Sequence, residues 1–468
     1  MESFYAESEH LPLLFWACGL LVLILAAYAF HQNRSSWALP CLSVLGTTAV
    51  WYLGDILYSG IDHIDKVFPQ SVIDRALWQV MLFLITYVLL CREVTRWFVR
   101  DREDHTSLFD QPDLFGNEKS QNEIAKMLWF TGLSWAIVVL IGLFRNGFPV
   151  VEVFAPYLAG RDVNMWGRER LGGAGDFLIS TGYFIHIFLS AVFGGILVLS
   201  RTLRLRMVTV IMILLAWPYW LFAYGRNVVL VLGIPATCGY FIFSRQRLAY
   251  RVAVAVMAFM AVNVWFKFTL ATRHSIGAAA ALTQIIEGET SAEFVTKTRH
   301  LGLDMFKELC YMNHYIENGK HSVNWGQGYF SEIVNFVPRS WWPGKPTVGI
   351  EFSIARGSQT RGMGSELVTS LITPGMIGQG VENFGTVLGP ITAAFLMAVW
   401  TGILSLFWTQ RRSALRACLF LIGLGLTFNT GRVITLQVFF PFVFGYLMAR
   451  VYERYERRQG VIRAPQGR

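Results

Sequence analysis

Long apolar runs separated by short polar segments follow one another along most of the chain. Many of these runs approach the roughly 20 residues that an α-helix needs to cross the hydrocarbon core of a bilayer. The pattern predicts about eleven helices, over residues 11–31, 37–59, 74–92, 127–144, 176–199, 207–223, 227–244, 250–271, 384–408, 414–428 and 432–451. We therefore expect an all-α polytopic membrane protein with about 11 transmembrane helices.

Basic residues cluster in the connections that follow alternate apolar runs. Because Lys and Arg are retained preferentially in cytoplasmic loops, this alternation predicts an extracytoplasmic N-terminus and a cytoplasmic C-terminus. The clusters are Arg34; Arg92, Arg96, Arg100 and Arg102; Arg201, Arg204 and Arg206; Arg245, Arg247 and Arg251; Arg411, Arg412 and Arg416; and Arg454, Arg457 and Arg458.

The same pattern divides the chain into four parts. Residues 1–271 carry eight predicted helices with short loops, 272–383 form one large extracytoplasmic loop, 384–451 carry three more helices, and 452–468 form a basic cytoplasmic tail. Within the large loop, apolar residues recur at helical spacing, which predicts an amphipathic helix over 293–318 at the interface or on the bundle. The polar segment 101–125 is expected to be a solvated cytoplasmic linker.

Composition narrows the classes of function. Hydrophobic residues make up 54% of the chain and charged residues 15%. The net charge of +9 comes from basic residues scattered among membrane loops, which does not indicate a nucleic-acid partner. We find no His-x-x-x-His pair, no Asp-x-Asp cluster and no P-loop, so neither a metal ion, a cofactor nor a nucleotide-driven step is expected.

The polar stretch from Tyr329 to Gly385 concentrates the candidate chemistry. Prolines on both sides of Arg339 stiffen the backbone, so its guanidinium and the Lys345 ammonium are expected to project from a rigid loop. Trp342 lies between them and can dock onto a membrane interface or a sugar ring. Fixed cations and flat aromatic rings together suit an anionic ligand that carries a glycan.

Extracytoplasmic arginines are unusual, because the rule that sorts loops across the membrane selects against them there. Several guanidinium groups around one cavity would bind a pyrophosphate at the lipid–water boundary, and the alternative for each is pairing with a lipid headgroup or a loop carboxylate. The candidates are Arg161, Arg226, Arg339, Arg356, Arg361 and Arg432.

Carboxylates near the same stretch are the candidates for a general base. Glu332, Glu366 and Glu382 flank the Pro-Arg sequence, and a base must reach the hydroxyl that it deprotonates. Asp55 lies inside an apolar run, where it is either functional or the counter-ion of an arginine.

These residues resemble a known family. Pro338-Arg339 followed by Trp342-Pro343-Gly344-Lys345-Pro346, and later Asn383-Phe384-Gly385 with Gly389, are similar to sequences of the Wzy-type oligosaccharide repeat-unit polymerases, the O-antigen and capsule polymerases of bacterial inner membranes. The chain departs from the family pattern at Gln379, where an acidic residue is expected, and it places Glu382 directly before Asn383.

The resemblance implies a GT-C-like bundle in the bacterial inner (plasma) membrane that carries out inverting, metal-independent glycosyl transfer at the periplasmic face. The donor would be the glycan on undecaprenyl pyrophosphate, and the acceptor one lipid-linked oligosaccharide repeat unit. Arg339 and Lys345 would stabilise the leaving pyrophosphate, and Glu332 or Glu366 would deprotonate the acceptor. The expected substrate-binding residues are Lys345, Arg226, Arg161, Arg356, Arg361, Arg432, Trp342 and Glu382. Membrane lipid, a chain-length regulator and a flippase are the expected partners.

Three alternatives stay open. An O-antigen ligase would use a similar bundle and would be favoured by a histidine motif in the loop, where His300, His314 and His321 lie. A flippase or exporter of lipid-linked glycan would need charges along a path through the membrane and paired broken helices. A non-catalytic scaffold would use its arginines only to bind lipid.

Overall fold

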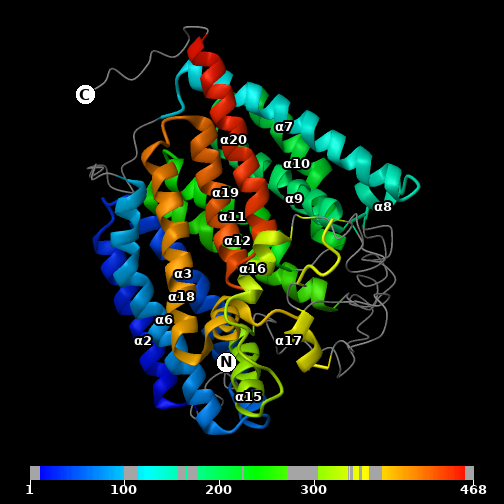
Figure 1. Cartoon of the computed structure of the whole chain (residues 1–468). Helices are drawn as coiled ribbons and strands as arrows, with labels where there is room; N and C mark the ends of the chain where they lie inside the picture. The colour runs from blue at the N-terminus through cyan, green and yellow to red at the C-terminus, as the bar shows by residue number, and fades with distance from the viewer. Residues whose placement is uncertain are drawn as a thin grey trace, which may run out of the picture.

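The computed structural model describes residues 11–99, 114–156, 165–166, 176–223, 226–271, 304–335, 337, 341–346, 350–357 and 372–458. Within these ranges the protein consists of helices and connecting segments, with no β-strand. Figure 1 shows them as a bundle, with the C-terminus at one end and α15 (Met305–Glu317) at the other. The expected all-α architecture is confirmed.

A helix occurs at each of the eleven ranges predicted from the apolar runs. These helices are α2 (Leu13–His31), α3 (Ala38–Thr48) continued by a π-helix (Ala49–Gly54) and α4 (Asp55–Ser59), α6 (Gln70–Phe98), α7 (Glu118–Arg145), α9 (Asp176–Leu199), α10 (Leu203–Ala223), α11 (Arg226–Phe243), α12 (Leu248–Ala271), α18 (Gly375–Thr409), α19 (Ala414–Thr430) and α20 (Leu436–Arg458). The shorter helices are α5 (Asp62–Asp65), α8 (Val150–Phe154), α15, α16 (Gln327–Val334) and α17 (Ile350–Ala355).

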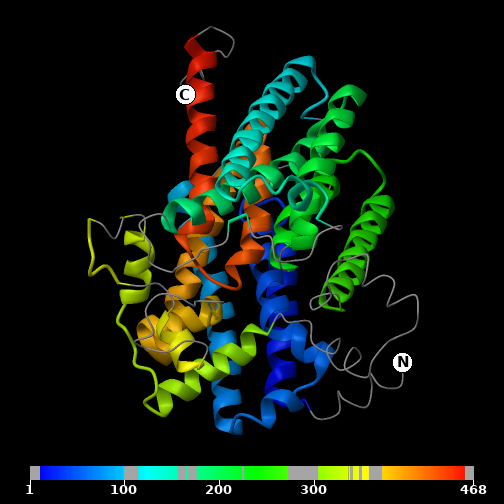
Figure 2. The ribbon, with the colours of Figure 1, turned by 90° about the vertical axis from the view of Figure 1, so that its right-hand side faces the viewer.

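Among the described residues, seven helices are long and apolar enough to cross a membrane. They cover Leu13–His31, Ala38–Leu57, Gln70–Phe98, Glu118–Arg145, Leu178–Leu199, Leu203–Phe222 and Gly375–Thr409. The bundle brings α6 against α18, while α9, α11 and α19 pack against one another and α7 and α10 flank α9 (Figure 2). These apolar helices indicate an all-α membrane protein.

Helix α7 begins inside the segment predicted as a linker. Asn117 caps the helix, because its side chain accepts a hydrogen bond of 2.7 Å from the backbone N–H of Ser120. Gln121 donates to the carbonyl oxygens of Phe115 and Leu199 at 2.7 and 3.3 Å, which ties this first turn to the end of α9. The linker prediction is thus wrong from Glu118 onward, while residues 101–113 lie outside the described part of the chain.

Helix α18 is two helical arms joined by a sharp bend. Gly385 has φ +77° and ψ −175°, a conformation that only glycine adopts readily. A Cβ atom added to Gly380 would lie 2.2 Å from the carbonyl oxygen of Gly389, although nine residues of straight helix would separate the two by about 13.5 Å. The first arm, 375–384, therefore folds back against the second, 386–409. The spanning helix predicted to begin at residue 384 corresponds to the second arm. The first arm lies in the last part of the predicted loop 272–383.

The amphipathic helix predicted over 293–318 is described only as α15. Leu309, Met312 and Tyr315 are buried on its inner face, which packs against α6 and α18. Residues 293–303 lie outside the described part of the chain. Helix α15 therefore lies on the surface of the bundle, which is one of the two locations expected from the sequence.

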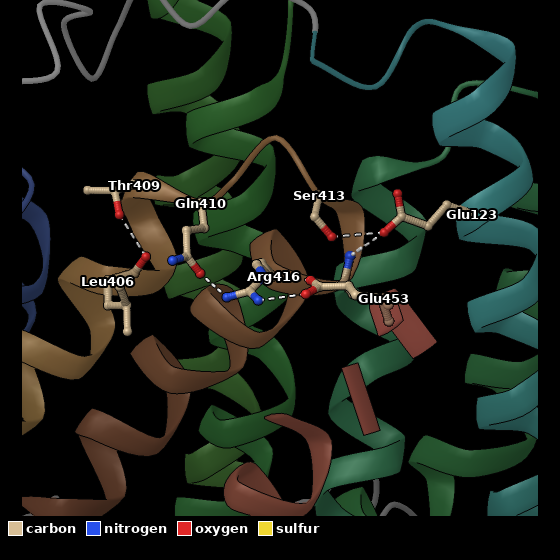
Figure 3. A network of polar contacts seen from close by, with 8 residues as sticks. Glu123, Leu406, Thr409, Gln410, Ser413, Arg416 and Glu453 are labelled. Carbon is tan, nitrogen blue, oxygen red and sulfur yellow. Dashed lines mark hydrogen bonds and ion pairs between the residues drawn. The ribbon is translucent and has the colours of Figure 1, made fainter. Parts of the chain in front are cut away.

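A polar network joins α7, α19 and α20 at the end of the bundle that carries the C-terminus (Figure 3). The Arg416 guanidinium donates to both carboxylate oxygens of Glu453, at 2.6 and 2.7 Å, and also to Gln410. Glu123 of α7 accepts from the Ser413 hydroxyl at 2.9 Å and from the Leu415 N–H at 3.3 Å. A carboxylate from one helix thus satisfies the free amides at the start of another.

Candidate functional site

The Asn383-Phe384-Gly385 sequence forms the end of the first arm of α18. The Asn383 side chain is fully buried; its Oδ1 accepts from the Tyr329 N–H at 3.1 Å, and its Nδ2 donates to the Gln379 carbonyl at 2.7 Å. The carbonyl groups of Glu382 and Asn383 accept from the N–H groups of Asn324 and Gly326, at 3.0 and 3.1 Å. In a continuous helix these carbonyl groups would accept hydrogen bonds from the next turn. Because the helix bends, they instead accept hydrogen bonds from segment 324–329.

That segment approaches α18 closely. A Cβ atom at Gly328 would lie 2.9 Å from both amide atoms of Asn383, so a larger residue there would displace the amide. Trp325 has φ +50°, which is uncommon outside glycine, and its side chain is 77% exposed. The result is an exposed indole on a turn whose backbone is bound to the bend of α18.

Four polar side chains meet beneath this turn: His321, Asn324, Tyr329 and Glu382, here called the polar cluster. Nε2 of His321 lies 3.5 Å from Oε1 of Glu382, and the two side chains are 7% and 8% exposed. Burial, and then the negative charge of Glu382, raise the pKa of the Tyr329 hydroxyl above its ordinary range. The cluster therefore places a carboxylate, an imidazole and a phenol around one shielded position.

Three atoms of the polar cluster are shielded from solvent and have no hydrogen-bond partner among the described residues. They are Nε2 of His321, Oδ1 of Asn324 and the hydroxyl oxygen of Tyr329. Each such group costs about 1–3 kcal/mol when it is left unsatisfied. Native structures leave few such groups unsatisfied, so these three atoms can bind a polar ligand.

Glu332 lies nearby on α16 but is engaged differently. Its Oε2 accepts from the Thr435 hydroxyl at 2.6 Å, and the residue is 5% exposed. Gln379 holds the same connection between α19 and α20, because its amide donates to the Ile434 carbonyl and accepts from the Ile434 N–H, both at 3.0 Å. An acid at position 379 could not donate, which explains why this chain carries an amide there.

Lys345 turns toward its own loop, in contrast to the outward projection expected from the sequence. Its Nζ donates to the carbonyl oxygens of Asn335 and Val337 at 2.9 and 2.8 Å. An ammonium group is favourable at the C-terminal end of a helix, and α16 ends at Val334. Trp342 lies edge-on to Phe330 of α16, with ring centroids 6.4 Å apart, and it is 38% exposed. Lys345 and Trp342 therefore attach the loop to α16.

Arg356 forms a structural pair. Its Nε and Nη2 donate to the two carboxylate oxygens of Glu308 at 2.9 and 3.0 Å, and its guanidinium lies 3.5 Å from the centroid of the Tyr311 ring. Burial raises the pKa of Glu308 even though Arg356 favours its ionised form. The sequence left open whether this arginine pairs with a loop carboxylate, and the structure shows that it does. The pair connects α17 to α15.

Arg432 lies half-buried in the connection between α19 and α20. Its guanidinium interacts electrostatically with Tyr183 of α9. Asp55 lies 3.6 Å from Nε2 of His63, so one partner of this carboxylate is a histidine.

The remaining predicted residues are not placed. Arg161, Arg339, Arg361 and Glu366 lie outside the described part of the chain, and Arg226 opens α11 with a side chain that is likewise not described. No group of three or more His, Cys, Asp or Glu residues that could hold a metal ion occurs within the described ranges.

Sequence reasoning missed His321, Asn324 and Tyr329 as members of a site. A signal was available in the run Asn324-Trp325-Gly326-Gln327-Gly328-Tyr329, where glycines alternate with polar and aromatic residues just before an amphipathic helix. Comparison with protein-family models, curated proteins and solved structures finds no match to this chain.

Proposed function

We propose that this protein is a membrane glycosyltransferase that polymerises oligosaccharide repeat units linked to undecaprenyl pyrophosphate. In this proposal eleven helices span the bacterial inner membrane, with the N-terminus and the loop 272–383 in the periplasm and the C-terminus in the cytoplasm. The reaction is an inverting transfer of the growing glycan onto one lipid-linked repeat unit, without a metal ion.

The polar cluster is the observation that carries the proposal. It combines a buried carboxylate with an imidazole 3.5 Å away, a pair suited to removing a proton from a hydroxyl group. The exposed ring of Trp325 lies on the segment that carries Asn324 and Tyr329, and flat aromatic rings suit the apolar faces of sugars. Helix α15, just before the cluster in the chain, lies at the end of the bundle opposite the end of α20 (Figure 1), where the proposal puts the periplasm.

In this proposal the basic residues bind the pyrophosphate groups of the two substrates. Arg339 stabilises the pyrophosphate as it leaves, and Arg161, Arg226, Arg361 and Arg432 bind lipid-linked pyrophosphate. Lys345 supports Arg339 by holding the carbonyls of Asn335 and Val337, just before it in the chain. Arg356 has a structural role, because Glu308 already occupies its guanidinium.

Reconstitution of the purified protein tests this proposal. Proteoliposomes receive the undecaprenyl-pyrophosphate-linked repeat unit without nucleotide or divalent metal, and the glycan is sized on a gel. We expect a ladder that is lost with Arg339→Ala and kept with Arg412→Ala, an exposed arginine in the connection between α18 and α19. A full ladder from Arg339→Ala would contradict the role of this arginine.

An O-antigen ligase is the second candidate, and the observation that favours it is a loop histidine, His321, beside Glu382. A ligase transfers the finished glycan to a lipid core. Adding lipid core to the same assay separates the two functions, because glycan attached to the core without a ladder would identify a ligase. Labelled glycan that only crosses the bilayer would instead identify a flippase.

A further inference from the structure

Nε2 of His321 and Oε1 of Glu382 lie within ion-pair distance of each other in the polar cluster. Nε2 and Oε1 are 3.5 Å apart and form no hydrogen bond with each other. An oxygen atom about 2.8 Å from both can donate its proton to the carboxylate while it accepts from the imidazole N–H. The polar cluster therefore offers the two contacts that a hydroxyl needs in order to lose its proton.

Glu382 differs in this respect from Glu332, the carboxylate favoured from the sequence. Glu332 already accepts a short hydrogen bond from the Thr435 hydroxyl. Around Glu382, in contrast, the His321 Nε2 and the Tyr329 hydroxyl lack hydrogen-bond partners among the described residues. These two groups and Oδ1 of Asn324 can supply the contacts that a ligand needs beside the carboxylate.

Glu382 is also held firmly. It lies in the last turn of the first arm of α18, its carbonyl accepts from the Asn324 N–H, and the adjacent Asn383 side chain binds both Tyr329 and Gln379. The bend at Gly385 directs this turn against segment 321–329. A rigid support of this kind keeps a catalytic group in its productive geometry.

We infer that Glu382 is the general base for the acceptor sugar and that His321 positions the acceptor hydroxyl, an inference that rests on the proposed function. The hydroxyl proton passes to the Glu382 carboxylate as the oxygen forms a bond to the anomeric carbon of the donor. The bond from that carbon to the pyrophosphate oxygen breaks, and its electron pair leaves with the lipid pyrophosphate. Glu382 then releases the proton to water.

Tyr329 and Asn324 bind the neighbouring hydroxyl groups of the acceptor, and Trp325 stacks on its ring. The Trp325 side chain is 77% exposed, so its ring is accessible to the acceptor.

Steady-state kinetics in the same proteoliposomes test the assignment. Glu382→Gln keeps the size of the side chain, and we expect kcat to fall by about 10²- to 10⁴-fold with little change in KM for the acceptor. Glu382→Ala is expected to regain activity as sodium formate is added, because formate can occupy the vacated position. His321→Ala is expected to raise KM for the acceptor, and His321→Gln, which supplies an amide donor, to restore part of the loss.

Glu317→Ala is the matched control, because Glu317 ends α15 and pairs with Arg75 at the surface. It should retain full activity and show no response to formate. Size-exclusion profiles and thermal melting establish that each variant is folded, and Glu382→Asp replaces Glu382→Gln if the latter is not. Near-normal kcat in a folded Glu382 variant, or rescue by formate of Glu332→Ala instead, overturns the inference while polymerisation stands. A wild-type protein without a ladder overturns both.

Discussion

At the scale of single residues, hydrogen bonding explains why a particular residue type occurs at position 379. Gln379 both donates to and accepts from the backbone of Ile434, and only an amide side chain offers both functions in that geometry. The residue thereby fixes the connection between α19 and α20, from which Thr435 reaches Glu332. Its role is to hold the surroundings of the site.

Replacing Gln379 with Glu should therefore destabilise the protein. The second carboxylate oxygen would face the Ile434 carbonyl oxygen, so a hydrogen bond would become a repulsion that costs about 1–3 kcal/mol. Thermal unfolding in detergent, followed by tryptophan fluorescence, should show a lower melting temperature. Gln246→Glu is the control, since Gln246 is exposed in the connection between α11 and α12. Equal melting temperatures for the two variants would refute this role of Gln379.

At the scale of elements, the bend of α18 determines where the site forms. The first arm ends at the bend and places Glu382 and Asn383 against segment 321–329. Gln79 of α6 supports the second arm, because its amide donates to the Thr386 carbonyl at 3.2 Å while it pairs with Asn313 of α15. One break in one helix thus brings α6, α15 and α16 to the same place.

The Gly380→Ala substitution tests this bend. Its Cβ would lie 2.2 Å from the Gly389 carbonyl oxygen, a backbone atom that cannot turn away, so the two arms must separate. We expect a loss of about 2 kcal/mol or more in the free energy of unfolding, together with lower polymerase activity. Gly46→Ala in α3 is the control, because a Cβ there meets no atom within 4 Å. Unchanged stability of Gly380→Ala would show that the arms are not in contact.

At the scale of the whole molecule, polar contacts connect helices that are distant in sequence at both ends of the bundle. At the end with the C-terminus, the Arg416–Glu453 pair joins α19 to α20, and Glu123 of α7 binds the start of α19. At the other end, Trp51 of the π-helix donates to the Phe428 carbonyl at 2.8 Å, and the Tyr52 hydroxyl accepts from the Ile377 N–H at 2.9 Å. The terminal helices are therefore attached to the bundle at defined points.

Arg416→Ala should destabilise this assembly by about 3 kcal/mol, because it leaves the Glu453 carboxylate in a largely buried position without its main cation. The double variant Arg416→Ala/Glu453→Gln should recover part of the loss, since the carboxylate charge that Arg416 compensates is then also removed. Arg412→Ala, at an exposed position in the same connection, should have little effect. Denaturant unfolding measures all three; a double variant less stable than Arg416→Ala would contradict this account.

The sequence alone determined which parts of the chain form helices. Hydrophobic runs of bilayer length must become helices, because backbone groups in hydrocarbon can be satisfied only by hydrogen bonds within the segment. The apolar runs set the limits of the predicted loop, and the second arm of α18 begins within one or two residues of the prediction at 384. The ends of α7 and α15 were less predictable. The start of α7 depends on the Asn117 cap, and the extent of α15 depends on its burial against neighbouring helices.

Only the tertiary structure decided which polar residues meet. His321 and Glu382 are 61 positions apart, and their proximity depends on the fold-back at Gly385 and on carbonyls that the bend makes available. The sequence left open whether Arg356 binds a ligand or a loop carboxylate, and it predicted that Lys345 projects outward; Glu308 and two loop carbonyls bind them. The spacing of hydrophobic residues reflects only the preferences of residues that are close in sequence. Contacts between distant polar residues result from the packing of the whole chain, so this spacing does not predict them.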